Sequence, residues 1–176
     1  MDLANFSLNN KIALVTGGSS GVGKMIALAL ARAGAFVWIV STRDNADEIV
    51  SEIEQQGSEG AFFQVDVTDS NKLETMLSHI YGVSKKIDIL VNNAGTNIPE
   101  HFTKIQKKNL EYLVKVNTMA TFHIAQLCAL KMLENKNRKK IGGSIINMSS
   151  QMGHVGGPID RKSTRLNSSH EWISYA

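Results

Sequence analysis

The 176-residue sequence predicts an α/β protein with a doubly wound parallel sheet and helices on both faces. Short apolar runs that suit buried strands alternate with longer stretches that suit helices, and short connections separate them. A glycine-rich turn, Thr16 to Gly23, joins the first such strand to the first such helix. Right-handed crossovers then give the strand order 3-2-1-4-5, in which ligands bind beyond the carboxyl ends of the strands.

The first half of the chain supplies three strands and two helices. Each expected strand is a short apolar run, and the second, Phe36 to Val40, is continuous, as in a strand covered on both faces. The expected helices are rich in helix-forming residues, and Gly34 and Gly57 stand where they should end. The strands are expected at residues 11–16, 36–40 and 61–65, and the helices at residues 21–33 and 46–56.

The second half adds two helices and two strands in alternation. Asp69 or Ser70 can cap the third helix, and a loop containing Pro99 precedes the fourth and longest one. Gly142 and Gly143 precede the fifth strand. In chain order, these elements are a helix at residues 70–81, a strand at 87–91, a helix at 107–133 and a strand at 144–148.

Composition and charge exclude several classes of function. The chain is 43% hydrophobic and 20% charged, as in a globular protein, and its net charge of +3 is too small and dispersed to indicate nucleic-acid binding. It has no secretory signal and no apolar run of membrane-spanning length, so we expect a cytoplasmic protein that does not bind membranes. The single cysteine, Cys128, cannot form an internal disulfide, and no Cys/His cluster predicts a metal site.

The glycine-rich turn has the arrangement that holds a pyrophosphate. Its glycines let the backbone approach the phosphates, and the N-terminus of the following helix offers N–H groups to the anion. The common dinucleotide pattern G-x-G-x-x-G is absent, because Ile26 occupies the third glycine position. A phosphate-loop NTPase pattern runs from Gly18 to Lys24, but Met25 replaces the hydroxyl residue that would bind magnesium. The pattern that fits is T-G-x-x-x-G-x-G.

Small and polar residues follow the other predicted strands at the same edge of the sheet. They are Ser41-Thr42-Arg43, Asp66-Val67, Asn92-Asn93-Ala94-Gly95 and Ser149-Ser150. Together with the glycine turn and with Asn117 in the long helix, these motifs resemble the short-chain dehydrogenase/reductase family over about residues 6 to 159. The resemblance implies a Rossmann-like fold, a small-molecule substrate and an oxidoreductase that moves a hydride between NAD(P) and a carbonyl or secondary alcohol.

The resemblance also implies roles for individual residues. Ser150 matches the catalytic serine, whose hydroxyl hydrogen-bonds the reacting oxygen. Asn117 matches the catalytic asparagine, whose backbone carbonyl holds a water in a proton relay. The carboxylate of Asp66 would accept a hydrogen bond from the adenine amine. The cofactor-binding residues implied in this way are Gly17, Ser19, Ser20, Gly21, Val22, Gly23, Arg43, Asp66, Val67, Asn93, Ala94 and Gly95.

The end of the second strand favours NADP over NAD as the cofactor. A carboxylate there would accept a hydrogen bond from the ribose 2′-hydroxyl and favour NAD, whereas arginine accommodates a 2′-phosphate. Ser41 occupies the usual acidic position, Arg43 is close by, and Lys24 follows the glycine turn. Asp44, beside Arg43, keeps NAD open as the alternative.

Beyond Ser150 the chain departs from the family pattern. The family places a tyrosine roughly a dozen residues after the serine and a lysine one helical turn later, to move a proton to or from the substrate. This chain has Lys162, Ser163 and Thr164 in that region. We therefore expect the chain as written to be inactive. Two other functions stay open: a dinucleotide-binding module without chemistry, and a phosphate-loop-like NTPase.

The last residues of the chain look foreign to the protein. Residues 160–176 resemble a translated sequencing-library adapter, because Asp160 to His170 can be back-translated in one frame into such a sequence. We expect a partial dinucleotide-binding domain at residues 1–159 and a non-native, unstructured tail at residues 160–176.

The long helix has a further implication from the family. There it packs across a subunit interface, so we expect a homo-oligomeric parent protein and, in this chain, a helix side that has lost part of its cover. The apolar residues expected on that side are Leu113, Val116, Phe122, Ile124 and Leu127.

Overall fold

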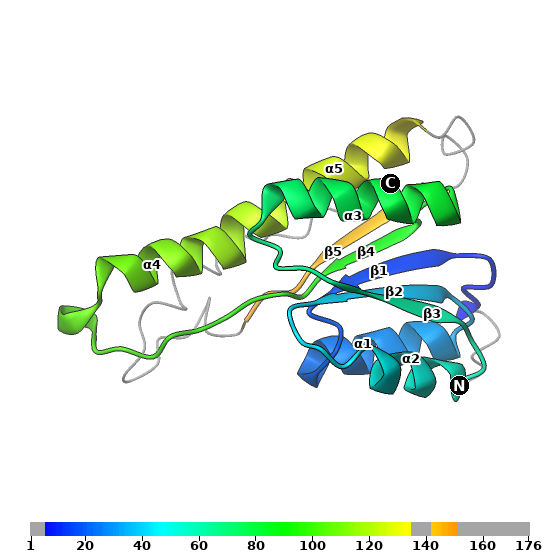
Figure 1. Cartoon of the computed structure of the whole chain (residues 1–176), viewed down its shortest axis with the longest axis horizontal. Coiled ribbons are helices and arrows are strands. Elements are labelled where there is room, and N and C mark those ends of the chain that lie inside the picture. The colour runs from blue at the N-terminus through cyan, green and yellow to red at the C-terminus, as the bar shows by residue number, and fades with distance from the viewer. Residues whose placement is uncertain (1–5, 135–141, 151–176) are drawn as a thin grey trace.

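A computed structural model describes residues 6–134 and 142–150, and these residues form a five-stranded parallel sheet (Figure 1). The strand order is β3-β2-β1-β4-β5, which confirms the predicted fold class. β1 lies between β2 and β4, so the direction of winding reverses beside it. The strands are β1 (Ile12–Thr16), β2 (Phe36–Ser41), β3 (Gly60–Gln64), β4 (Ile89–Asn92) and β5 (Ser144–Asn147).

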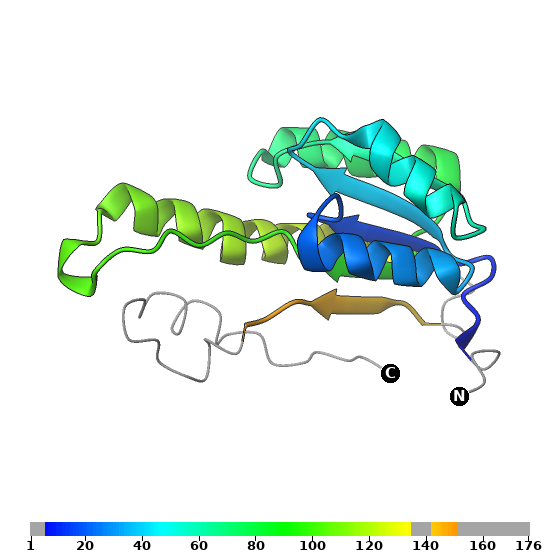
Figure 2. The same cartoon turned by 90° about the horizontal axis from the view of Figure 1, so that it is seen from below.

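Helices cover both faces of this sheet. α1 and α2 lie against one face, and α3 and α5 lie against the other (Figure 1, Figure 2). α4 and the loop before it project past the carboxyl end of β4. The helices are α1 (Gly21–Arg32), α2 (Ala46–Glu54), α3 (Ser70–Ser84), α4 (Lys107–Val114) and α5 (Thr121–Glu134), with a short 3₁₀ turn at Phe102–Lys104.

The helix ends follow the predicted signals, with one extension. Gly34 and Gly57 come just after α1 and α2 with φ angles of +98° and +80°, the left-handed conformation that glycine adopts without strain. Asp69 caps α3, because its side chain accepts a hydrogen bond from Lys72 N at 3.1 Å. α3 runs about one turn longer than predicted, to Ser84, because the left-handed residue that ends it comes only after that point.

The longest predicted helix is interrupted. Instead of one α-helix over residues 107–133, the chain forms α4, then a π-helical segment at Lys115–Ala120, then α5. This segment contains Asn117, which has a low helix propensity and whose side chain forms its hydrogen bonds outside the helix. π-helical turns occur frequently at functional sites, so the interruption marks Asn117 as a residue to inspect.

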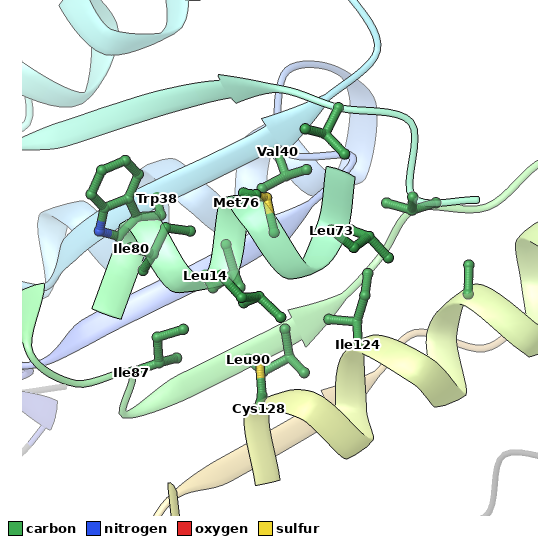
Figure 3. Close-up of a cluster of buried hydrophobic side chains, with 14 of the residues drawn as sticks. Leu14, Trp38, Val40, Leu73, Met76, Ile80, Ile87, Leu90, Ile124 and Cys128 are labelled. Atoms are coloured by element: carbon green, nitrogen blue, oxygen red, sulfur yellow. The ribbon is translucent and has the colours of Figure 1, made fainter. Parts of the chain in front are cut away.

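Alternation along the strands divides the apolar core into two clusters, one on each face of the sheet. In β1, Leu14 faces the cluster under α3 and α5, whereas Ala13 and Val15 face the cluster under α1 and α2. β2 alternates in the same way, with Trp38 on the first side and Ile39 on the second. Figure 3 shows the first cluster, with Leu14, Trp38, Val40, Leu73, Met76, Ile80, Ile87, Leu90, Ile124 and Cys128 labelled.

The expected loss of cover on the long helix is wrong for most of the residues named. Leu113, Val116 and Ile124 are buried, because they lie on the side of the helix that faces the rest of the molecule. Leu127 is partly buried and packs against the α3–α5 cluster. Phe122 alone of this set is open to solvent, at 66% exposed. The outward side of the helix also exposes Met119, Leu130 and Leu133.

Two expectations concern residues outside the described part of the chain. The boundary at residue 159 and the unstructured tail at residues 160–176 both lie there, so they stay predictions. Among the described residues, none of the helices is both long and apolar enough to span a membrane.

Candidate functional site

A cavity of about 460 Å³ opens at the carboxyl ends of the central strands. Its volume lies within the range of small-molecule sites, and its position beside the reversal between β1 and β4 is the usual ligand site of such sheets. Thr42, expected at this edge, lines it, and so do Thr96, Tyr112 and Val116, which were not predicted to be there. The predicted residues that line it are Gly17, Ser20, Val22, Gly23, Arg43, Asp66, Val67, Asn93, Ala94 and Gly95.

Close packing explains why the turn between β1 and α1 needs a glycine at position 23. A Cβ added to Gly23 would lie 2.3 Å from Asn93 Nδ2 and 2.3 Å from Gly17 O, closer than atoms can approach. Gly17 has a φ of +64°, a conformation that side chains disfavour. The start of α1 therefore sits directly on the loop after β4, which brings both into the same cavity wall.

Thr16 ties the glycine turn to that loop. Its Oγ1 accepts hydrogen bonds from Asn93 N at 3.1 Å and Ala94 N at 3.0 Å. In return, Asn93 Nδ2 donates to Thr16 O and Gly17 O, both at 3.2 Å. The sequence analysis missed Thr16 as a site residue, although its place at the head of T-G-x-x-x-G-x-G was the available signal. Asn93 acts on the cavity mainly by holding its walls together.

A second tie joins the glycine turn to the end of β2. The buried hydroxyls of Ser19 and Ser41 are 2.7 Å apart, and Ser19 donates to Ser41. Ser41 Oγ also accepts from Arg43 N at 3.1 Å. Asn45 Nδ2 donates to Ser19 O at 3.2 Å. Ser19 is therefore buried beneath the turn, and neither Ser19 nor Gly21 is among the residues that line the cavity.

Lys24 does not extend toward the cavity, although the sequence analysis counted it in favour of a phosphate. Its ammonium pairs with Glu52 at 2.6 Å and with Glu48 at 3.4 Å, both on α2. The hydrogen bond that Lys24 donates to Glu52 raises the pKa of Lys24 above its ordinary value, with a smaller contribution from the one to Glu48. Lys24 thus links α1 to α2, and Met25 beside it is exposed.

The end of β3 contributes a carboxylate and an apolar side chain. Asp66 Oδ1 accepts a hydrogen bond from Thr68 N at 2.8 Å, which orients the carboxylate at the cavity rim. Val67 is buried and belongs to the α3–α5 cluster, against which Ala94 also packs. This part of the cavity therefore offers a polar edge and an apolar floor.

Asn117 lies behind the loop that follows β4. Its Nδ2 donates to Thr96 O and its Oδ1 accepts from Thr96 N, each at 2.9 Å. A Cβ added to Gly95 would come within 3.4 Å of Asn117 Oδ1, so the two elements are in direct contact. Asn117 does not itself line the cavity, but it holds Thr96, which does.

Ser150 lies three residues after the end of β5, beyond Met148 and Ser149, and is partly buried. It does not line the cavity, in contrast to the residues after β2, β3 and β4. Nearby, Asn92 Nδ2 donates to Asn147 Oδ1 at 2.9 Å, which joins the ends of β4 and β5. The structure thus brings most of the residues predicted to bind a cofactor together around one cavity, whereas Ser150 and Asn117 do not line it. Across the described ranges, no three potential ligands among His, Cys, Asp and Glu gather for a metal.

Comparison with known proteins decides the family. The family model described as short chain dehydrogenase matches residues 11–160. The chain belongs to the short chain dehydrogenase family. It is 31% identical over 150 residues to the 3-oxoacyl-(acyl-carrier-protein) reductase FabG of Staphylococcus aureus, covering 84% of this chain and 59% of that protein. It is 35% identical over 152 residues to the uncharacterized oxidoreductase YgcW of Escherichia coli, covering 86% and 56%.

Solved structures of the family share the fold. A short-chain dehydrogenase/reductase from Mycobacterium marinum superposes with a TM-score of 0.85 at 29% identity, covering 96% of this chain and 68% of that one. A 7α-hydroxysteroid dehydrogenase complexed with NADH and 7-oxo glycochenodeoxycholic acid gives 0.86 at 29% identity, covering 96% and 64%. The chain spans less than two thirds of the length of the curated relatives named above.

The cavity fits the nicotinamide dinucleotide that the short chain dehydrogenase family uses. α1 begins at the cavity with Gly21, and its N-cap, Ser20, makes no side-chain hydrogen bond to the helix within the described structure. The first turn of α1 also carries no acidic residue. The first N–H groups of α1 and its positive dipole end can therefore receive a phosphate.

Proposed function

We propose that this chain is the dinucleotide-binding part of an NAD(P)-dependent oxidoreductase acting on a small carbonyl compound or secondary alcohol. The observation that carries the proposal is the single cavity wall formed by the glycine turn and the loop after β4, joined through Thr16 and Asn93. A bound nicotinamide dinucleotide would supply the hydride donor or acceptor. The protein residues hold it and exclude water from the reacting atoms.

We assign the pyrophosphate to the start of α1. The backbone N–H groups around Ser20, Gly21 and Val22 would bind the phosphate oxygens, and Gly17 and Gly23 leave room for that approach. Ser19, buried below the turn, supports the turn instead of contacting the ligand.

The adenosine side favours NADP because of the hydrogen bonding of Ser41. Ser41 Oγ lies 2.7 Å from Ser19 Oγ and accepts a hydrogen bond from Arg43 N. Ser41 lines the cavity, and its hydroxyl can donate a hydrogen bond there. A donor suits the oxygens of a 2′-phosphate, whereas NAD selection uses a carboxylate that accepts from the 2′-hydroxyl. Arg43, also in the cavity wall, adds a positive charge.

The relatives whose names state a cofactor name NAD or NADH. One is described as an NAD-dependent glycerol dehydrogenase, from Listeria innocua, and one solved structure contains NADH. Our preference for NADP rests on Ser41 and Arg43 of this chain and no longer on Lys24, which is paired with Glu52 and Glu48.

The nicotinamide side is assigned to Asn93, Ala94 and Gly95, which form the floor of the cavity after β4. Asn117 supports this floor through Thr96, and its own backbone carbonyl would hold a water for proton transfer. Ser150 would hydrogen-bond the substrate oxygen from the end of β5. The exposed Met119, Phe122, Leu130 and Leu133 support self-association of the protein through the outward side of the long helix.

Calorimetric titration of the 176-residue chain with NADP, NAD and Mg²⁺–ATP tests the function. Binding of NADP with a lower dissociation constant than NAD is expected. Failure of both dinucleotides to bind would overturn the proposal, and magnesium-dependent binding of ATP alone would favour the NTPase. The pairing of Lys24 with α2 counts against the NTPase, because that function needs a lysine on the phosphates. A repaired, full-length protein that binds the cofactor but turns over no substrate would favour the module without chemistry.

A further inference from the structure

Tyr112 is the aromatic residue in the lining of the cavity, within the part of the chain that the structure describes. It comes from α4, which projects past the carboxyl end of β4 (Figure 1, Figure 2). Tyr112 and Val116 are one helical turn apart, so they share a face of the helix, and both contribute to the cavity wall. No sequence motif of the family drew attention to Tyr112.

Burial differs sharply between these two residues. Val116 is 7% exposed and is packed into the cavity wall, whereas Tyr112 is 46% exposed. A half-exposed aromatic ring at the mouth of a cavity leaves apolar surface in water that a flat ligand group can cover. A nicotinamide dinucleotide carries two flat rings, the purine and the nicotinamide, and aromatic side chains stack on purine bases.

The neighbours of Tyr112 in the cavity match the adenine end of the ligand. Val67 gives an apolar floor, Asp66 gives a hydrogen-bond acceptor at the rim, and Arg43 stands at the end of β2. We propose that the ring of Tyr112 stacks on the adenine of the bound dinucleotide and forms the outer wall of its binding site. This inference rests on the proposed function, since it needs a dinucleotide in the cavity.

Fragments of the cofactor separate this contact from the rest of the site. The 176-residue chain is titrated calorimetrically with AMP, with nicotinamide mononucleotide and with NADP. Tyr112→Ala should weaken AMP and NADP by about five- to tenfold, the lower end of base-stacking energies, and leave nicotinamide mononucleotide unchanged. Tyr112→Phe keeps the ring and should bind all three as the original chain does. Leu110→Ala, on the same helix but outside the cavity lining, is the matched control.

The outcomes distinguish the two levels of the proposal. If the original chain binds AMP and Tyr112→Ala binds it equally well, stacking is refuted while the proposed function stands. An equal loss in Tyr112→Phe and Tyr112→Ala would assign the contact to the phenolic hydroxyl and also refute stacking. If the original chain binds neither AMP nor NADP, both the proposed function and the role of Tyr112 fall.

Discussion

Asn117 and Thr96 exchange two hydrogen bonds, Nδ2 to O and N to Oδ1, each 2.9 Å long. This pair joins the π-helical segment between α4 and α5 to the loop after β4, 21 residues away along the chain. The amide of asparagine is the side chain that can satisfy one backbone N–H and one C=O at once, in the way a neighbouring strand would. The pair therefore fixes the cavity floor at Gly95 and Thr96 from behind.

Replacing Asn117 by leucine removes both hydrogen bonds while keeping a side chain of similar size. We expect a loss of about 1–3 kcal/mol in the free energy of unfolding, because the N–H and C=O of Thr96 lose their partner in a partly buried place. Urea denaturation of the original chain and of the variant measures this difference in the free energy of unfolding. Asn109→Leu on α4 is the control, since the Asn109 side chain donates to another side chain, Glu100 Oε1, and not to a backbone group. Equal losses in both variants would contradict a special role for the Asn117–Thr96 pair.

Gly23→Ala should disrupt the site more than any other single methyl group added to the turn. The new Cβ would meet Asn93 Nδ2 and Gly17 O at 2.3 Å, so α1 must move away from the loop after β4. Both thermal stability and dinucleotide affinity should fall. Gly82→Ala is the matched control in α3, where the added Cβ meets open space, and it should raise stability by about 0.5–1 kcal/mol. Unchanged cofactor affinity in Gly23→Ala would contradict the close packing.

Arg43→Ala should weaken NADP binding more than NAD binding, since only NADP carries the 2′-phosphate. Ser41→Asp should shift the preference toward NAD by providing an acceptor. Lys24→Ala should leave the ratio of the two dissociation constants unchanged, because Lys24 is paired with α2. The ratio of the NADP and NAD dissociation constants is measured by calorimetric titration for the unaltered chain and for each of the three variants. Tenfold tighter binding of NAD by the unaltered chain would refute the preference for NADP.

The single thiol reports on folding. Burial raises the pKa of Cys128 to about 12, from 9.0 for an unperturbed thiol. Between these two pH values the thiol is deprotonated in the unfolded state and still protonated in the folded state. The free energy of unfolding should therefore be unaffected by Cys128 below pH 9 and should decrease as the pH rises toward 12. The slope is at most about 1.4 kcal/mol per pH unit. Cys128→Ala should lack this component, and at pH 8 the folded thiol should resist DTNB until urea unfolds the chain.

The chain as written should show no dehydrogenase turnover. Ser150 can hydrogen-bond a substrate oxygen but is a poor acid and base near neutral pH, and no tyrosine–lysine pair follows it in the sequence. Loss of the general acid–base contribution alone costs on the order of 10² to 10⁴ in rate. The assay follows cofactor absorbance over a panel of ketones and alcohols, beside a version completed with a family C-terminal half. Turnover that Ser150→Ala abolishes would show that another proton donor exists.

Apolar periodicity and glycine positions were sufficient to predict most helices and strands and the order of the strands, because these signals depend on residues that are close in sequence. The cavity lining was also predicted in large part, since parallel strands bring their carboxyl ends to one edge. What the sequence could not indicate were pairings of side chains across distant elements. Ser19 bonds Ser41, Lys24 pairs with Glu52, and Asn117 in the π-helical segment bonds Thr96, each partner being 21 to 28 residues away.

The tie between Thr16 and Asn93 spans 77 residues of sequence. During synthesis, the glycine turn emerges long before its partner loop exists, and no local contact can replace that loop. Pairing of β4 with β1 closes this segment, and closing a long segment costs conformational entropy. The cavity wall at the glycine turn is therefore complete only when the loop after β4 is in place. A nascent chain that ends before Asn93 has α1 and its glycines but lacks the loop that packs against them.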